Sequence, residues 1–219
     1  MGKAIPTVEG WHSQHMVFAM DFSAWNCFTA DEKAAARNEL KAFLAELESK
    51  HQAKEGSYAF YDCNGAKGDL ILWILGPSLE YLAQVERKFR RLAIASVLVQ
   101  TYSYTSVTEV STYVKAKLDT EEVNQKLYPH VPRDKYICFY NMTKKREGAD
   151  NWFMLPPQER GALMKAHGEL GKTYLDVLSE FTTGGCGLDD WEWGITIFSN
   201  DDIQFKKIVY DMRFEVASA

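Results

Sequence analysis

A histidine set among apolar residues is the first group in the chain that could do chemistry. It belongs to a stripe with i, i+4, i+7 spacing, which places its imidazole on the apolar face of a helix: Leu163, His167, Leu170, Tyr174 and Leu178. Gly168 and Gly171 follow within about one turn, although each glycine costs a helix about 1 kcal/mol relative to alanine. Their missing side chains leave room for something flat beside the imidazole, such as a porphyrin whose iron binds His167. The alternative is a hydrogen-bonded core histidine.

A tyrosine followed by cations is the second candidate. Tyr140 lies near the end of the apolar run 134–142, and Lys144, Lys145 and Arg146 come directly after it. A tyrosine at the end of a strand usually packs its ring, and a charge run usually forms a solvated turn. Alternatively, these cations bind the carboxylates of a ligand beside the phenol, where buried charge-assisted contacts are strong. The residues alone leave both interpretations open.

Composition narrows the class of protein. The 219 residues are 46% hydrophobic and 25% charged, and the net charge of −5 disfavours general nucleic-acid binding. The four cysteines form no C-x-x-C pair, so they indicate neither a zinc site nor a disulfide scaffold. No apolar run reaches the roughly 18 residues of a membrane span, and the first residues contain no apolar targeting region. We therefore expect a soluble, cytoplasmic protein with no nucleic-acid or membrane partner.

The elements that must position these residues follow a repeated pattern. In the first half, we expect strands at 11–20 and 98–110, helices at 29–52 and 78–95, and a hairpin over 56–76. The order βαββαβ is that of a ferredoxin-like fold. Thr29 or Asp31 is the expected N-cap of the first helix.

The second half repeats the order. We expect a strand at 134–142, a helix at 156–181, a hairpin of 182–187 with 191–198, a helix at 201–212 and a last short strand, "RFEV". Residues 115–133 are polar and contain prolines, which is typical of a connector. The predicted fold is thus α+β, with tandem ferredoxin-like repeats of antiparallel sheets and outer helices. Its predicted parts are an N-terminal half (1–115), a connector (116–133) and a C-terminal half (134–219), which would be the heme-binding half if His167 binds a porphyrin iron.

Three longer stretches resemble the chlorite dismutase-like family, and most closely its coproheme decarboxylase branch. They are "LYPHVPRDKYICFYNMTKKREGADNWFMLPPQERGALMKAHGELGKTY", "GLDDWEWGITIFS" and "QFKKIVYDMRFEVASA". The resemblance implies a peroxide-dependent heme synthase that converts Fe-coproporphyrin III (coproheme) to heme b with loss of two carbon dioxide molecules. It also implies a homopentamer and a transient contact with the upstream ferrochelatase.

The resemblance assigns roles to individual residues. His167 matches the iron ligand, and Tyr140 matches the catalytic tyrosine whose radical starts the decarboxylation. Lys144 matches the lysine beside the reacting propionate. The other matches are to porphyrin-binding positions: Lys126, Met142, Glu180, Arg213 and Ser218.

Some positions depart from the family pattern. Lys126 replaces an arginine, which loses a bidentate fork, and Asn141 replaces a proline, which is expected to loosen the turn after Tyr140. Glu180 stands where decarboxylases often have glutamine and chlorite dismutases have arginine. The alternatives are a chlorite dismutase or peroxidase-type heme enzyme, a heme-binding protein without turnover, and a relative that binds no heme.

Overall fold

The computed structural model describes residues 3–65, 67–111, 120–148 and 150–218. The chain divides into two compact units: unit 1 comprises Met1–Gly10, Thr108–Leu127 and Pro132–Ala219, and unit 2 comprises Trp11–Val107 and Tyr128–Val131. The predicted boundary at 115–116 and the first residues of the predicted connector lie outside the described residues. The later part of that connector contains a short helix, α4 (Glu121–Leu127).

Unit 2 has the predicted ferredoxin-like order. The elements follow one another as β1 (Thr7–Met20), α1 (Phe22–Cys27), α2 (Ala30–Gln52), β2 (Ser57–Asp62), β3 (Leu70–Gly76), α3 (Leu79–Phe89), a 3-10 turn η1 (Ala93–Val97) and β4 (Leu98–Ser111). The strands lie in the order β2-β3-β1-β4, in which β3 is antiparallel to both β1 and β2. Thr29 is the N-cap of α2, because its hydroxyl accepts from Glu32 N–H while the Glu32 carboxylate accepts from Thr29 N–H.

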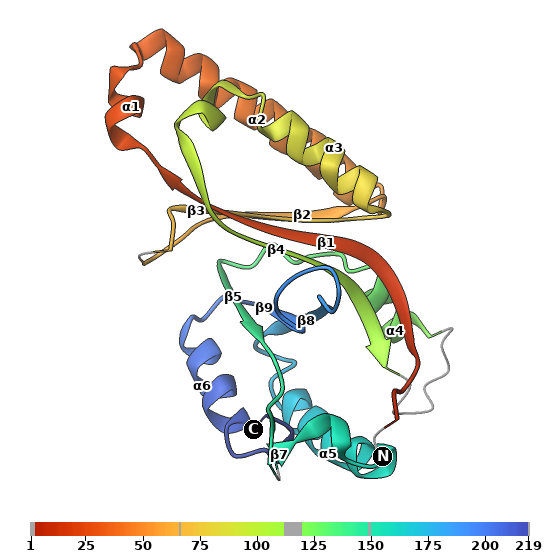
Figure 1. Ribbon diagram of the computed structural model, residues 1–219. Helices are drawn as coiled ribbons and strands as arrows, with labels where there is room; N and C mark the ends of the chain where they lie inside the picture. Colours follow the sequence, from red (N-terminus) through yellow and green to blue (C-terminus); the bar gives the residue numbers. More distant parts are fainter. Residues whose placement is uncertain (1–2, 66, 112–119, 149, 219) are drawn as a thin grey trace. The chain divides into compact units, whose positions relative to one another are not determined.

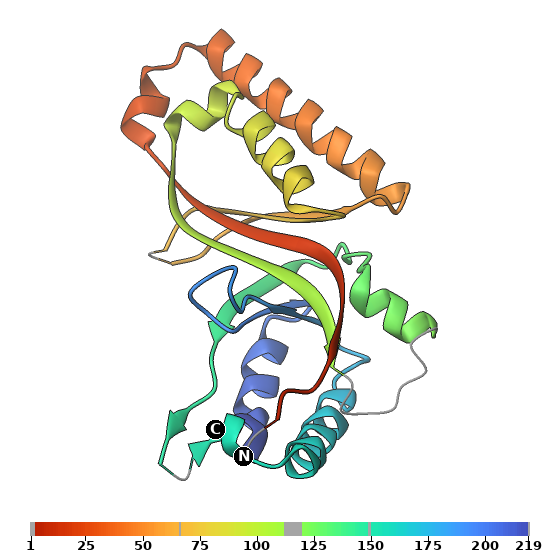
Figure 2. The same ribbon diagram turned by 45° about the vertical axis from the view of Figure 1, so that its right-hand side comes forward.

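Helices α2 and α3 lie side by side over one face of these strands (Figures 1 and 2). The hydrophobic core of unit 2 lies between the helices and that face. Its buried side chains come from both layers: Met16, Phe18, Phe43, Leu47, Leu72, Ile74, Leu82, Val85 and Phe89. The apolar run of β3 and the apolar faces of the helices predicted these strands and α2 within a few residues. The helix predicted over 78–95 is shorter, because α3 ends at Phe89 and the 3-10 turn η1 follows, and the short helix α1 was not predicted.

Unit 1 contains the C-terminal elements. They are β5 (Tyr136–Met142), the two-residue strands β6 (Arg146–Glu147) and β7 (Asp150–Asn151), η2 (Trp152–Met154), α5 (Pro157–Lys172), β8 (Ser179–Gly184), β9 (Trp193–Ser199), α6 (Ile203–Met212) and η3 (Val216–Ser218). Strand β9 is antiparallel to both β5 and β8. The core packs strand residues against α6 and the segment after α5, with Leu178, Ile195, Ile197 and Ile208 at its centre.

Helix α5 is shorter than the predicted helix over 156–181. It ends at Lys172, with Thr173 as the C-cap, and the chain turns through 173–177 before β8 begins at Ser179. The turn is closed by backbone bonds from Val177 and Leu178 N–H to the Tyr174 carbonyl. Leu178 keeps its predicted place in the core although it lies beyond the helix. Glu180 is therefore a strand residue.

The predicted last strand over "RFEV" was wrong. The backbone N–H groups of Arg213, Phe214 and Glu215 bond back to carbonyls of the last turn of α6, and η3 follows. The described residues after α6 therefore contain no strand, and the longer strands of unit 1 lie in the order β8-β9-β5. Asn141 lies within β5, as the predicted strand over 134–142 requires, and it pairs with Gly194.

Candidate functional site

One face of the unit 1 sheet carries the polar site residues. Across β9, Tyr140 pairs with Ile195 and Met142 with Trp193, while Glu180 pairs with Ile197. Directly paired residues and residues two apart point to the same side of a sheet. Tyr140, Met142 and Glu180 therefore share one face with the buried Ile195 and Ile197. Met142 packs on the core cluster at that face.

The side chains of Tyr140 and Glu180 both reach solvent, yet enough protein surrounds them to raise both of their pKa values. Tyr140 is 37% exposed, and its pKa is raised, first by desolvation and then by the charge of Glu180. Desolvation also raises the pKa of the Glu180 carboxyl, and a hydrogen bond with Thr182 opposes this in part. The phenol is therefore protonated at neutral pH, and a carboxyl of raised pKa lies within electrostatic reach of it.

His167 lies on α5 with one ring nitrogen already engaged. Its Nδ1 is 3.4 Å from Ser218 Oγ in η3, and burial together with the Lys144 charge lowers its pKa, against a smaller opposite effect of Glu215. The imidazole is therefore neutral at neutral pH, which is the form that binds metals. A partner at Nδ1 helps to orient the ring, so Nε2 is the nitrogen that could bind a metal. The predicted contact of Ser218 with a propionate stays a prediction.

The glycine after His167 borders open space. A Cβ added to Gly168 would meet no atom of the chain within 4 Å, and one added to Gly171 would meet only Met212 Cε, at 3.6 Å. Packing against the described residues therefore does not require glycine at 168. The predicted space for a flat ring beside the imidazole stays a prediction.

Lys144 is buried although it lies just beyond β5. It is 9% exposed, its Nζ is 4.9 Å from the centre of the Trp152 ring, and burial lowers its pKa while the charge of Glu192 opposes that shift. Its charge in turn helps to lower the pKa of His167. The structure thus brings Lys144 within electrostatic reach of the predicted iron ligand.

Sequence reasoning missed Glu192 and Trp152, which contact Lys144 directly. Glu192 accepts a hydrogen bond from the Lys144 backbone N–H at 2.8 Å, and Trp152 provides the aromatic face beneath its ammonium. The sequence did contain a pattern that could have predicted Trp152. The residue follows the cationic run 144–146 closely enough for a short hairpin to bring its ring back to Lys144. No local pattern could have found Glu192, because its partners lie more than 45 residues earlier in the chain.

Two predicted porphyrin-binding cations do not join this group. Lys126, on α4, forms an exposed ion pair with Glu122 at 2.9 Å, so its charge is already partly balanced. Arg213 is the exposed C-cap of α6, and its guanidinium forms no ion pair with the part of the chain that the structure describes. Their predicted roles stay predictions.

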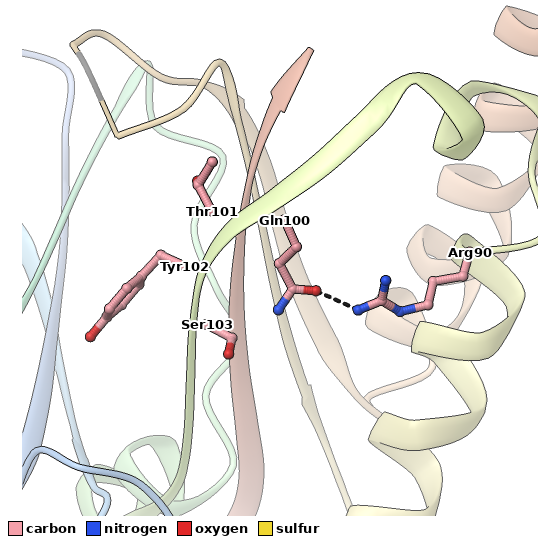
Figure 3. Close-up of a pocket in the computed structure, with 5 residues that line it drawn as sticks. All are labelled: Arg90, Gln100, Thr101, Tyr102 and Ser103. Atoms are coloured by element: carbon pink, nitrogen blue, oxygen red, sulfur yellow. Dashed lines mark hydrogen bonds between the residues drawn. The ribbon is translucent and has the colours of Figure 1, made fainter. Parts of the chain in front are cut away.

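A pocket in unit 2 is poorly suited to chemistry. It has a volume of about 400 Å³ and is lined by Arg90 and residues 100–103 of β4 (Figure 3). The Arg90 guanidinium bonds to Gln100 and forms an ion pair with Glu86 at 2.7 Å. Its one cation is therefore already balanced, and we assign no site there.

Ligands for a bare metal ion are also missing from the described residues, because no three histidine, cysteine or carboxylate side chains gather there. A metal at His167 would therefore need ligands from another molecule.

No helix in the described residues has the length and apolar character needed to cross a bilayer. The unit 1 arrangement combines one neutral imidazole beside open space, one protonated phenol, one carboxyl of raised pKa and one buried cation.

Comparison with known proteins identifies the family of the chain. The fold matches a heme-binding protein from Thermus thermophilus with a TM-score of 0.96 and 42% identity, covering 100% of this chain and 89% of that one. It matches a variant of chlorite dismutase from Candidatus Nitrospira defluvii with a TM-score of 0.74 and 18% identity, covering 95% and 84%. Residues 33–219 match the family described as chlorite dismutase. The chain therefore belongs to the chlorite dismutase family.

Proposed function

We propose that this protein converts iron-coproporphyrin III to heme b by peroxide-dependent oxidative decarboxylation. The observation that carries the proposal is the accessible, protonated Tyr140, which shares one sheet face with the Glu180 carboxyl and whose strand is followed by the buried cation Lys144. Further support comes from the heme-binding relative at 42% identity. A heme carrier would have no use for this combination of groups.

The residues around α5 fit a porphyrin. A porphyrin brings its own ring nitrogens to the iron, so a single neutral imidazole such as His167 completes the protein's part of the ligation. The open space at Gly168 supports this, because a flat ring could lie against the helix there. Lys144 would bind the reacting propionate, while Arg213, Lys126 and Ser218 would bind the other carboxylates, and Met142 would contact the ring.

The bound iron porphyrin would supply the oxidising power from hydrogen peroxide. Each propionate that becomes a vinyl group loses carbon dioxide, one proton and two electrons, and one peroxide takes up two electrons and two protons to give two waters. Tyr140 would give up one electron and its phenolic proton, and its oxygen would then take a hydrogen atom from the propionate. The second electron would pass from the resulting carbon radical to the iron porphyrin as carbon dioxide leaves, and solvent would supply the one further proton that peroxide needs. Lys144 holds that propionate in reach, which is how binding contacts increase a rate.

Glu180 would serve as the distal proton acceptor. A base is most effective when its pKa lies near the working pH, and desolvation moves the Glu180 carboxyl in that direction. When ionised, the same carboxylate would repel chlorite, which is an anion. Glu180 therefore favours peroxide over chlorite as the oxidant.

The proposed working form is a cytoplasmic homopentamer that meets its ferrochelatase transiently. Large apolar side chains on and after α6 are exposed in the single chain, among them Phe214 at 75%. Sedimentation velocity would measure the assembly, and a monomer at micromolar concentration would contradict the pentamer.

Absorbance titration with iron-coproporphyrin III and with heme b tests the proposal, followed by addition of peroxide or chlorite to each complex. We expect binding of both porphyrins, tighter binding of the tetracarboxylate, and conversion of its spectrum to that of heme b by peroxide. Rapid oxygen release from chlorite without such conversion would instead identify a chlorite dismutase.

A further inference from the structure

Glu192, just before β9, is a buried carboxylate of unit 1 whose two oxygens both accept hydrogen bonds. It is 7% exposed, and its Oε2 accepts from the Thr143 hydroxyl at 2.5 Å and from Lys144 N–H at 2.8 Å. Its Oε1 accepts from the Arg146 guanidinium, with which it forms an ion pair. Burial alone would raise its pKa, but these hydrogen bonds outweigh burial and lower it. The carboxylate is therefore ionised, and both oxygens act as acceptors.

These contacts hold the turn of residues 143–146 against the start of β9, the strand that pairs with β5. Tyr140 lies opposite Ile195 and Met142 opposite Trp193, the residue directly after Glu192. The two-residue strands β6 and β7 extend the turn, and Arg146 lies 4.6 Å from the centre of the Phe153 ring. The Glu192 carboxylate thus fixes the position of the turn that follows β5.

The Lys144 ammonium depends on this anchor in two ways. Its backbone is held by the bond from its own N–H to Glu192, so its side chain leaves from a fixed point and lies over Trp152. Its burial favours the neutral amine, and the charge of Glu192 opposes that effect. A buried cation without a compensating charge would be costly.

We propose that Glu192 is a positioning residue, which acts through Lys144 to aim its ammonium at the propionate that reacts with Tyr140. Glu192 itself touches no substrate in this role, because both of its oxygens are already occupied within the chain. The inference rests on the proposed function. In this role, the Glu192–Lys144 pair is also the reason why the protein binds iron-coproporphyrin III more tightly than heme b, which has fewer carboxylates.

The variant Glu192→Gln tests this role with little change of shape. A glutamine offers one acceptor oxygen and one donor NH₂, so it cannot satisfy Arg146 on one side and Thr143 with Lys144 N–H on the other. We expect the preference for iron-coproporphyrin III over heme b, measured as the ratio of dissociation constants without peroxide, to fall about tenfold. Glu147→Gln, which neutralises an exposed carboxylate in the same turn, should leave the ratio unchanged.

A double-mutant cycle separates positioning from general stability. Lys144→Met should lower the same ratio, and Glu192→Gln combined with Lys144→Met should lower it no further than Lys144→Met alone. Losses that add in the double variant would show that Glu192 acts independently of Lys144, and would overturn the proposal. If Glu192→Gln does not fold, Thr143→Val serves in the same cycle with an expected loss of about threefold, because it removes one bond to the carboxylate.

The rate of product formation distinguishes the two proposals. If wild-type protein forms heme b with peroxide while Glu192→Gln matches it in both rate and porphyrin preference, only the positioning role is wrong. If wild-type protein forms no decarboxylated product, the proposed function is wrong, and the positioning role falls with it.

Discussion

Tyr140 and Glu180 lie on the same face of one sheet, on the two strands that flank β9, and the charge of Glu180 helps to keep the Tyr140 phenol protonated. The relationship depends on the alternation of side chains in both strands. A shift of either strand by one residue would turn its side chain to the opposite face. The pair therefore depends on the register of β5, β8 and β9.

Removal of the Tyr140 hydroxyl should separate binding from turnover. Tyr140→Phe keeps the ring, and the hydroxyl forms no hydrogen bond with the described residues, so the free energy of unfolding should change by about 1 kcal/mol or less. Coproheme should bind with wild-type affinity, and peroxide should yield no heme b. Product formation at the wild-type rate would exclude the radical role.

His167→Ala should remove the iron ligand without unfolding the protein. The side chain is only partly buried, so circular dichroism should be unchanged, whereas the spectrum of histidine-ligated ferric porphyrin should be lost. Ser218→Ala is the matched control, because it removes only the partner at Nδ1 and should keep the ligated spectrum. An unaltered spectrum in His167→Ala would mean that another residue binds the iron.

Gly168→Ala should have opposite effects on stability and on binding. The added methyl group meets open space and favours the helix, so the porphyrin-free protein should gain up to about 1 kcal/mol of unfolding free energy. Porphyrin affinity should fall, because the methyl group would occupy the space proposed for the ring. In Gly171→Ala, the methyl group would contact Met212 instead, and affinity should be kept. Equal porphyrin affinity in both variants and wild type would place the ring elsewhere.

Glu180→Gln should change the pH dependence of stability and of the peroxide reaction. The pKa of Glu180 is higher in the folded than in the unfolded state, so its contribution to stability is most favourable below the unfolded pKa and is lost as pH rises through the folded pKa. The glutamine variant should therefore gain stability relative to wild type as pH rises through that interval. Chemical denaturation at several pH values measures the difference.

The rate of the peroxide reaction gives the second readout for Glu180. In wild type, the rate should rise as the carboxyl ionises, and in Glu180→Gln it should be lower and independent of pH over that interval. Asp176→Asn, an exposed carboxylate of the same unit, is the control for a change of one charge. Superimposable pH–rate curves for wild type and Glu180→Gln would remove Glu180 from the mechanism.

Much of the fold and part of the site could be predicted from local sequence. The strands and the first long helix of the first repeat were predicted within a few residues because of their apolar patterns and the N-cap at Thr29, whereas the second helix ends six residues before its predicted end. The two glycines after His167, which a helix does not favour, predicted a position where no packing demands a small residue, and Gly168 has open space around it. These features depend on neighbours within one or two turns.

The errors and omissions arose where distant residues decide the structure. The stripe through Tyr174 and Leu178 was apolar enough to continue a helix, but Leu178 reaches the same core from a turn that leads into β8. "RFEV" has the residues of a strand, yet its backbone bonds to the end of α6. Glu192 is recognisable only once β9 and the 143–146 turn lie together.

Mass analysis of the porphyrin during a peroxide titration tests the central claim most directly. Protein loaded with iron-coproporphyrin III should show the stepwise loss of two carboxyl groups, with about two peroxide molecules consumed per heme b formed. Tyr140→Phe, loaded in the same way, should retain all four carboxyl groups. Consumption of peroxide by the wild-type protein with the porphyrin mass unchanged would contradict the account.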